Sequence, residues 1–477
     1  MAAISTLVLN PSYDCNELVN HHCSSLFVSQ KSFSPLTVKR RNHRFQKASG
    51  GRSVIPVSAS YSFDVVVIGA GIIGLSIARR FLLHSDLSVA VVDASVPCSG
   101  ATGAGQGYLW MVHKTPGNDV WDLSIRSQKL WQMWADDIQD QGIDPLKVLG
   151  WKKTGSLLIG RTTKESDELK KRVQQLSAAG IRAEYLSYGD LHWEEPELAV
   201  GTEGSAAFSP DDCQLDAHRT VAFIEEGNRL FASHGRYTEF YHDPAVCFLR
   251  SSRKGNVEGV KTKKNSLYGK KAIVVAAGCW TGLLMRELLG ESDIIVDVPV
   301  QPRKGFLLVL EKFNSLKLNH GLMEADYVNH ENFVSASDAF DHDQSLSISM
   351  TATIDASGNL LIGSSRQLAG FNIELNKQIV DRIWEHAAQF FPALKELSLA
   401  SFREQRKVRI GLRPYMPDGK PVIGPIPGMP NVFLATGHEG GGLSMALGTA
   451  EMVADMVLEQ PLKVDHKPFA VEGRCCR

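Results

Sequence analysis

FDVVVIGAGIIGLSIARRFLLHSDLSVAVVD, the stretch from Phe63 to Asp93, decides the fold of this chain. Its run Val65–Ile68 is apolar and β-branched, which is typical of a strand buried on both faces. The glycine turn Gly69–Gly74 follows, and apolar residues then recur at helical spacing. Val89–Val92 has the composition of a second buried strand. The stretch therefore predicts a strand, a turn, a helix and a strand, which is the beginning of a parallel α/β sheet.

The glycine turn has the GxGxxG spacing of a dinucleotide-binding loop. Gly69 permits a tight turn, Gly71 lets the backbone approach a pyrophosphate, and Gly74 lets the helix pack closely on the sheet. The helix N-terminus offers N–H groups to the phosphates. Asp93 stands at the end of the second strand, where a carboxylate binds ribose hydroxyls and disfavours NADP. We expect FAD or NAD here; the alternative is a glycine-rich turn without a ligand.

A second glycine cluster, CSGATGAGQG, follows at residues 98–107. Such a loop is too flexible to stabilise a core, because glycine loses much conformational freedom on folding. It is explained if its backbone wraps a ligand, and NAD-dependent dehydrogenases do not usually carry this second loop. The cluster therefore favours FAD, and the alternative is a surface linker.

The remainder of the chain alternates helices and strands. Strand, glycine turn and helix occur a second time between Asn431 and Val453, so both ends of the chain are expected to build one cofactor domain while the middle supplies another. Apolar periodicity predicts the other elements. These are helices over 119–141, 166–176 and 211–232 (entered at Asp216), strands at 272–275 and 300–310, and a hairpin over 346–364 with its turn at 355–359.

Composition excludes several classes of protein. The 477 residues are 43% hydrophobic and 22% charged, as in soluble globular proteins, with a formal net charge of -1. A strongly basic nucleic-acid surface is therefore not indicated. None of the eight cysteines belongs to a CxxC pair, so neither a zinc site nor a disulfide framework is expected. No apolar run is long enough to span a bilayer.

Residues 1–59 differ from the rest of the chain. They are rich in serine and in Lys/Arg, and Asp14 and Glu17 are their only acids. This composition is typical of an organelle transit peptide. Met1-Ala2-Ala3 and Val57-Ser58-Ala59 resemble plastid targeting and processing sites. We expect a disordered chloroplast transit peptide; the alternatives are a mitochondrial targeting sequence and a disordered tail without a targeting signal.

Three motifs together resemble the D-amino-acid-oxidase type of FAD-dependent oxidoreductases, which includes glycine oxidase, sarcosine oxidase and D-amino-acid dehydrogenase. They are GAGIIG at Gly69–Gly74, VVAAGCWTG at Val274–Gly282, and GLRPYMPDGKPVIGP at Gly411–Pro425 with FLATGHEGGG at Phe433–Gly442. The resemblance covers roughly residues 61 to 460. It implies an α/β fold with a Rossmann-like FAD-binding domain built from discontinuous segments (60–150, 205–285 and 405–477). An antiparallel β-sheet substrate domain would comprise 151–204 and 286–404.

The resemblance also implies which residues hold FAD. Sarcosine oxidases place a flavin-linking cysteine near Gly411, so glycine there indicates non-covalent FAD. The helix N-terminus after His438 would stabilise the negative charge of reduced flavin. For His438 itself, a packed structural histidine is an equally good interpretation. The implied cofactor residues are Gly69, Gly71, Ile72, Ile73 and Gly74 at the pyrophosphate; Asp93 and Ala94 at the ribose; Ala101, Thr102, Gln106, Gly107 and Tyr108 along the second loop; Val246 at the adenine; Gly278 and Trp280 beside the ribityl chain; and His438, Glu439, Gly440, Gly441, Gly442, Leu443 and Ser444 along the pyrimidine edge of the flavin.

Arg413 is the expected substrate residue, because a guanidinium binds a carboxylate bidentately and the arginine of the GLRP motif does so in glycine-oxidase-like relatives. The alternative is a structural ion pair. Two departures separate this chain from glycine oxidase. Gly440 replaces that enzyme's second arginine, and its pocket histidine and tyrosine fall near Met350 and Ala352. A substrate other than glycine is therefore expected.

These observations predict an FAD-dependent oxidoreductase that oxidises the C–N bond of a small amino acid or secondary amine by hydride transfer to flavin N5, giving an imine. Molecular oxygen or a quinone would reoxidise the flavin. No metal, nucleic-acid partner or transmembrane segment is expected. The alternatives are an FAD-dependent 2-hydroxy-acid dehydrogenase and an FAD-binding assembly factor of an organellar complex.

Overall fold

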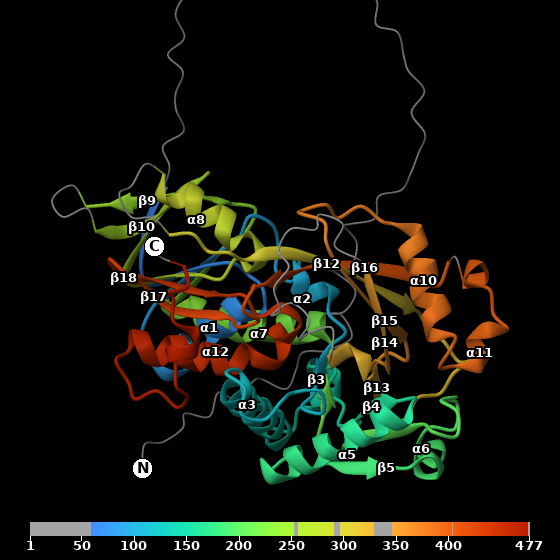
Figure 1. The fold of residues 1–477 in the computed structure, drawn as a ribbon. Helices are drawn as coiled ribbons and strands as arrows, with labels where there is room; N and C mark the ends of the chain where they lie inside the picture. The colour runs from blue at the N-terminus through green and yellow to red at the C-terminus, as the bar shows by residue number, and fades with distance from the viewer. Residues whose placement is uncertain (1–58, 252–255, 291–295, 329–345, 403, 476–477) are drawn as a thin grey trace, which may run out of the picture. The chain divides into compact units, whose positions relative to one another are not determined.

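The computed structural model describes residues 59–251, 256–290, 296–328, 346–402 and 404–475 (Figure 1). Residues 1–58 of the expected transit peptide lie outside these ranges, and its last residue, Ala59, begins strand β1. The described chain contains two large β-sheets. The decisive stretch near Phe63 lies in the first sheet, and most of the second comes from later segments.

The first sheet has its parallel strands in the order β18-β11-β1-β2-β8. An antiparallel strand, β17, lies beside β18, and the antiparallel pair β9 and β10 extends from β11. The bounds are β1 (Ala59–Ile68), β2 (Val89–Val92), β8 (Tyr237–Phe240), β9 (Ala245–Arg250), β10 (Val257–Thr262), β11 (Asn265–Val275), β17 (Val422–Ile426) and β18 (Met429–Thr436).

Both faces of this sheet are buried. Val65 and Val67 of β1 belong to one core, which α1 (Ile72–His84), α7 (Ala217–Arg229) and α12 (Gly442–Val457) help to form. The alternating residues Val66 and Ile68 belong to a second core with α8 (Thr281–Leu289). Alternate side chains of a strand point to opposite faces, so the continuous apolar run of β1 is explained by helices on both sides (Figure 1).

A buried carboxylate fixes the helix that begins at the last glycine cluster. Glu451 of α12 accepts hydrogen bonds from Arg126 of α3 (Trp121–Asp140) at 2.6 and 2.7 Å, and from Arg80 of α1 at 3.1 Å. Trp131 of α3 donates its indole N–H to the carbonyl of Leu443, 3.0 Å away. Helices α1 and α3 therefore hold α12, including its N-terminus, in place against the first sheet.

The second sheet has the order β16-β12-β15-β14-β13-β4-β6-β5 and is antiparallel except for the β13–β4 pair. The expected hairpin is confirmed: β14 pairs with β15, and Asp355 accepts hydrogen bonds from the turn amides of Ser357 and Asn359. The bounds are β4 (Ser156–Gly160), β5 (Glu184–Leu186), β6 (Ser205–Ser209), β12 (Gln301–Leu310), β13 (Gly321–Glu324), β14 (Ser347–Ile354), β15 (Leu360–Leu368) and β16 (Arg406–Tyr415).

Short elements join or cover the two sheets, which gives the mixed α/β fold that the sequence predicts. Asp216 caps α7 by accepting from the amide of Arg219, as expected. The smaller elements are α2 (Ala101–Ala104), α4 (Pro145–Val148), α5 (Thr163–Ala178), α6 (Tyr188–Glu194), α10 (Lys377–Ala387), α11 (Pro392–Lys395) and the two-stranded pair β3 (Tyr108–Leu109) and β7 (Cys213–Gln214). In Figure 1, α10 and α11 lie beside the second sheet, away from α1 and α12.

Two strands fall on the other side of the expected domain boundaries. β6 lies in the range 205–285 and β16 in the range 405–477, both assigned to the cofactor domain, but both strands pair in the second sheet. An isolated strand sequence does not specify its pairing partner, because pairing depends on neighbours distant in the chain. The strand β16 consequently carries its Arg413 into the second sheet.

Candidate functional site

The first glycine turn has the close contacts that its spacing predicts. Gly69 has a φ of 119°, and a Cβ there would overlap the carbonyl of Ala276. A Cβ on Gly74 would overlap the carbonyl of Gly69, so only glycine lets α1 approach the strand. Helix α1 begins after Gly71, which has no side chain to cap the N-terminal amides. Such a helix end binds phosphate well.

The second glycine cluster lies against the first, as expected if both wrap one ligand. The hydroxyl of Thr102 in α2 accepts a hydrogen bond from the amide of Ile72, 3.2 Å away. The next residue, Ile73, is partly buried within α1. Gly107, with a φ of 96°, packs on the carbonyl of Leu215. The loop is thus a fixed wall rather than a surface linker.

Asp93 lies at the carboxyl end of β2, beside the glycine turn. Its two carboxylate oxygens accept hydrogen bonds from the amides of Ala70 and Ser95, each at 2.7 Å. Ala94 is exposed next to it, and Val246 is 43% exposed on the edge strand β9. The backbone carbonyl of Asp93 accepts from the amide of Asp243, three residues before Val246. The expected ribose and adenine residues are therefore neighbours.

The motif after β11 forms a 3₁₀ turn, η2 (Gly278–Trp280). Gly278 has a φ of 55°, and its carbonyl accepts hydrogen bonds from the hydroxyls of Thr281 and Thr436, each at 2.8 Å. Trp280 is 41% exposed and approaches Gly100 of the second glycine cluster. Both residues thus lie at the carboxyl ends of the parallel strands, where ligands bind in open α/β sheets.

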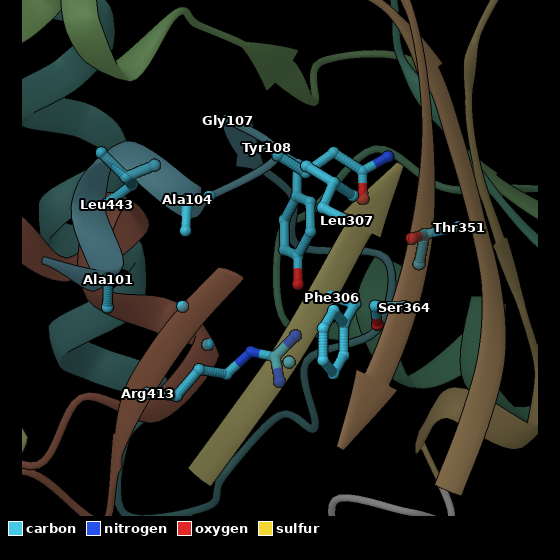
Figure 2. A pocket seen from close by; sticks show the side chains of 15 residues that line it. Ala101, Ala104, Gly107, Tyr108, Phe306, Leu307, Thr351, Ser364, Arg413 and Leu443 are labelled. Carbon is cyan, nitrogen blue, oxygen red and sulfur yellow. The ribbon is translucent and has the colours of Figure 1, made fainter. Parts of the chain in front are cut away.

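A pocket lies between the second glycine cluster and the second sheet (Figure 2). It contains about 610 Å³ of empty space, part of it open to solvent. Residues 101–108 form one wall, and strands β12, β14, β15 and β16 form the other. Its lining residues are Ala101, Ala104, Gly105, Gln106, Gly107, Tyr108, Gly305, Phe306, Leu307, Thr351, Ser364, Gly411, Arg413, Gly440 and Leu443. Of the expected cofactor residues, Gln106 turns partly away and donates to Thr353, 3.2 Å distant.

Arg413 points its guanidinium into this pocket, toward Tyr108 and Phe306 (Figure 2). Its Nη1 donates to the carbonyl of Ser365, 3.1 Å away, and the group lies over Gly305 of the neighbouring strand. Among the described residues no carboxylate lies within ion-pair distance of it. This placement does not fit a structural ion pair and leaves the guanidinium available for a ligand.

The last glycine cluster brings α12 to the same place. Gly440 and Leu443 line the pocket. Gly441 and Gly442 form the turn into the helix, where the hydroxyl of Ser444 donates to the carbonyl of Gly441 at 3.0 Å. The N-terminus of α12 therefore lies beside the pocket wall made by residues 101–108.

The structure distinguishes the two interpretations of His438. Its imidazole is 3% exposed, and Nε2 lies 2.9 Å from the hydroxyl of Thr449 in α12. Burial lowers the pKa of His438 to about 3, so the ring is neutral at physiological pH. His438 is thus a packed structural histidine that orients the helix, and its side chain is not among the pocket lining.

Glu439 has a different environment from its neighbours. It has a φ of 46°, accepts a hydrogen bond from the amide of Gly440, and pairs with Arg303 of β12 at 3.5 Å. Burial raises the pKa of Glu439, but the charges of Arg413, Arg303 and Arg366 lower it by a larger amount, so its pKa lies below the ordinary value. Glu439 therefore faces the arginines of the second sheet.

Sequence reasoning missed several residues of this site. Tyr327 is 2% exposed, and its hydroxyl lies 2.7 Å from that of Tyr108. The guanidinium of Arg366 lies over the Tyr327 ring, 3.9 Å from its centre. Both hydroxyls approach Gly440, the position at which glycine oxidase has its second arginine. No local motif marks these residues; only the pairing of distant strands brings them together.

The hairpin residues near Met350 and Ala352 divide between the core and the pocket. Met350 and Ala352 are fully buried in the apolar core of the second sheet. Thr351, between them, lines the pocket instead. Because side chains alternate along a strand, a shift of one residue exchanges the core face for the pocket face. The departure from glycine oxidase at this place must therefore be read at Thr351.

The segment after Tyr108 is fixed by a buried carboxylate. Asp212 is fully buried and accepts hydrogen bonds from the amides of Met111 and Val112 at 2.8 and 3.1 Å, and from the hydroxyl of Ser156 at 2.6 Å. This anchor also places Lys114, whose ammonium lies near Gly441 at the beginning of α12. A cation is unfavourable at a helix N-terminus, so its position favours an anionic ligand there.

The donor set fits FAD. The N-terminus of α1 would bind the pyrophosphate, the oriented carboxylate of Asp93 would bind the ribose, and the residues around α2 and the start of α12 would bind the flavin. Within the described ranges, no group of three His, Cys, Asp or Glu side chains could hold a metal. None of the helices described is both long and apolar enough to cross a membrane.

Comparisons with known proteins match the chain to FAD-dependent oxidoreductases. The family model DAO, described as "FAD dependent oxidoreductase", matches residues 64–456. The chain is 26% identical over 420 residues to glycine oxidase of Pseudomonas aeruginosa, covering 86% of this chain and 99% of the relative. It is 23% identical over 443 residues to hydrogen cyanide synthase subunit HcnC of Pseudomonas protegens, covering 85% and 95%. The crystal structure of glycine oxidase from Geobacillus kaustophilus has a TM-score of 0.70 at 21% identity, covering 86% of this chain and 99% of that one.

Proposed function

Because this chain belongs to the DAO family of FAD-dependent oxidoreductases, we propose that it oxidises the C–N bond of a small amino acid or secondary amine to an imine. One observation carries the proposal: the Arg413 guanidinium points into a pocket whose opposite wall is the glycine cluster near α2. An arginine so placed binds a carboxylate in a fixed orientation. Relatives named glycine oxidase and D-amino acid dehydrogenase support an amino-acid substrate.

The residues of the pocket position the substrate. Arg413 binds the carboxylate and directs the α-carbon toward the wall near α2, and such positioning supplies much of the rate enhancement. FAD, when bound, accepts two electrons as hydride from that carbon. Phe306, Leu307 and Leu443 make the walls apolar and exclude water.

The pocket also limits the protonation state of the substrate. Its described lining contains no histidine, aspartate or glutamate, so we assign no general base. The amine would enter as the free base, and Tyr108 is the one titratable residue of the described lining besides Arg413. The imine product leaves and hydrolyses to an oxo acid and an amine or ammonia.

Anaerobic mixing tests the proposal. The purified flavoprotein is mixed with L-, D- and N-methyl amino acids while the visible flavin absorbance is followed, and the products are then assayed for ammonia or amine. Loss of the flavin band with release of one amine per flavin supports the proposal. Reduction by 2-hydroxy acids alone, without amine release, would instead identify the alternative hydroxy-acid dehydrogenase, whose substrate Arg413 could also bind.

We also propose how the flavin is reoxidised and where the protein is located. Molecular oxygen or a quinone reoxidises the flavin, and oxygen consumption measured against quinone reduction distinguishes them. Residues 1–59 direct the protein to the chloroplast; a fusion of these residues to a fluorescent protein would show plastid fluorescence, and mitochondrial fluorescence would contradict the proposal. An assembly-factor role would require a stable co-purifying partner and a flavin that no amine reduces.

A further inference from the structure

Three arginines occupy three adjacent strands of the second sheet beside the pocket. Arg413 on β16 pairs directly with Arg303 on β12, and Arg303 also pairs with Leu368, two residues after Arg366 on β15. Directly paired residues on antiparallel strands lie on the same face, with Cα atoms about 4.5–5.5 Å apart. The register therefore places the Cα atoms of Arg413 and Arg303 side by side on one face of the sheet, and the Arg303 guanidinium lies over the ring of Tyr415, 5.0 Å from its centre.

The carboxylate of Glu439 interacts electrostatically with the guanidiniums of all three arginines. Glu439 pairs with Arg303 through a single 3.5 Å contact. Burial alone would raise its pKa, but the charges of Arg413, Arg303 and Arg366 hold it below its ordinary value. Glu439 also precedes Gly440, which lines the pocket together with Arg413. The positive charge is thus concentrated at one place rather than spread along the sheet.

These neighbouring positive charges destabilise the folded protein when no ligand is bound. Like charges directly opposite each other on neighbouring strands destabilise a sheet, and burying a guanidinium requires good compensation. Arg303 is only 12% exposed, and Arg413 has no ion-pair partner among the described residues. Glu439 is the one acid that the described residues supply to Arg303. The arrangement becomes favourable when further anions enter.

We infer that the substrate carries two carboxylates, as an amino- or imino-dicarboxylate, with one bound by Arg413 and the second by Arg303. The inference rests on the proposed function, because it assigns the class of amine that the pocket takes. Two substrate carboxylates together with Glu439 would face the guanidiniums of Arg413 and Arg303. The close pairing of Arg303 and Arg413 suits a small molecule whose carboxylates are separated by only a few bonds.

Matched substrate pairs test the inference on the intact flavoprotein. The pairs are aspartate and asparagine, glutamate and glutamine (each as both enantiomers), and iminodiacetate and N-methylglycine, which differ mainly in one negative charge. The second-order rate constant for anaerobic flavin reduction is expected to be at least tenfold higher for the dicarboxylate of a productive pair. If amines reduce the flavin but the neutral member is equally fast or faster, the inference fails while the proposed function stands.

Variants of Arg303 locate the selectivity. Arg303→Met should bring the ratio of dicarboxylate to neutral rate constants close to one while neutral amines still reduce the flavin, and Arg303→Lys should keep part of the ratio. Lys407→Met is the matched control, because it removes a half-exposed cation from β16. Retained flavin and an unchanged circular dichroism spectrum verify folding. An unchanged ratio in Arg303→Met would overturn the assignment.

Binding without turnover tests the inference independently of catalysis. Malonate and acetate are titrated into the oxidised holoprotein, and the perturbation of the flavin spectrum gives each dissociation constant. Malonate should bind at least tenfold more tightly than acetate, and Arg303→Met should remove the difference. Equal affinities would overturn the two-carboxylate inference even if no amine were oxidised. If malonate is preferred but no amine reduces the flavin, the anion site stands and the proposed function fails.

Discussion

The guanidinium of Arg413 lies over Gly305, so closely that a Cβ on residue 305 would stand 2.7 Å from its Cζ. The contact follows from the sheet: Gly305 pairs with Gly411 on β16, and Arg413 is two residues further along that strand. Glycine is needed here for space rather than for an unusual φ. The position of the substrate-binding charge thus depends on a residue that has no side chain.

Gly305→Ala should displace the Arg413 side chain and misplace the substrate carboxylate. Because small misplacements reduce catalysis steeply, kcat/KM should fall about 10- to 100-fold, with flavin content unchanged. Steady-state kinetics with the best amine measures this. Gly189→Ala in α6, where a Cβ would have no contact closer than 4.0 Å, is the control. Wild-type kinetics in Gly305→Ala would show that the contact is unimportant.

Two substitutions of Arg413 should distinguish the contribution of its positive charge from that of its planar, two-pronged geometry to substrate binding. Arg413→Lys keeps the charge but loses the planar fork, whereas Arg413→Met loses both. Since a charged hydrogen bond contributes about 1.5–3 kcal/mol, the KM should rise roughly tenfold in the lysine variant and 100-fold or more in the methionine variant. FAD should stay bound, because the phosphate-binding turn is elsewhere. An unchanged KM would contradict the role assigned to Arg413.

Lys114→Met should lower the reduction potential of the bound flavin. The Lys114 ammonium lies near Gly441 at the N-terminus of α12, where a positive charge stabilises a reduced, anionic flavin. A charge at a helix terminus contributes about 1 kcal/mol, which corresponds to roughly 20 mV for a two-electron couple. A dye-coupled potential titration would detect the shift. Lys170→Met, on the exposed side of α5, should leave the potential unchanged.

Asp212→Asn should change how stability depends on pH. Burial raises the pKa of Asp212 to about 6, although hydrogen bonds from Ser156, Met111 and Val112 partly offset this. Because the folded-state pKa exceeds the unfolded value near 4, the proton stabilises the fold below about pH 4, and this contribution is lost as pH rises through 6. The difference amounts to about 3 kcal/mol for two pKa units.

Urea unfolding at pH 4, 5, 6 and 7 measures that dependence. The wild-type free energy of unfolding should lose this contribution over the range, and Asp212→Asn should lack it. Asp211→Asn, which changes a 41% exposed neighbour, is the control. Parallel curves for the wild type and Asp212→Asn would contradict the raised pKa.

Local sequence specified the parts of the molecule that depend on local chemistry. The turn at Gly69, the carboxylate of Asp93, the cap at Asp216 and the hairpin turn at Asp355 are all placed as the sequence predicts. Each rests on a conformational or hydrogen-bonding need that a few adjacent residues express. Whether these residues bind FAD as the resemblance implies stays a prediction.

Distant pairing could not be predicted in the same way. Arg303 and Arg366 come together because their strands, far apart in the chain, lie side by side, and Arg366 lies over Tyr327, which follows β13; no periodicity marks these contacts. The sequence located the hairpin positions only near Met350 and Ala352, and the face of the strand, which alternates from residue to residue, decides that Thr351 lines the pocket. The domain expected to hold β16 was assigned from chain position, whereas its hydrogen bonds to β12 place it in the second sheet.

The first sheet joins β1 from one end of the chain to β18 from the other, through β11. Roughly 360 residues separate the turn at Gly74 from Thr436, and a ribosome adds about 5–20 residues per second. About 20–70 s therefore pass between the synthesis of the two halves of the cofactor cradle. During that interval the emerging chain has the phosphate turn but no α12, so the cradle is incomplete and cofactor capture is expected only after α12 has been made; for a protein imported into a plastid, capture would then follow import.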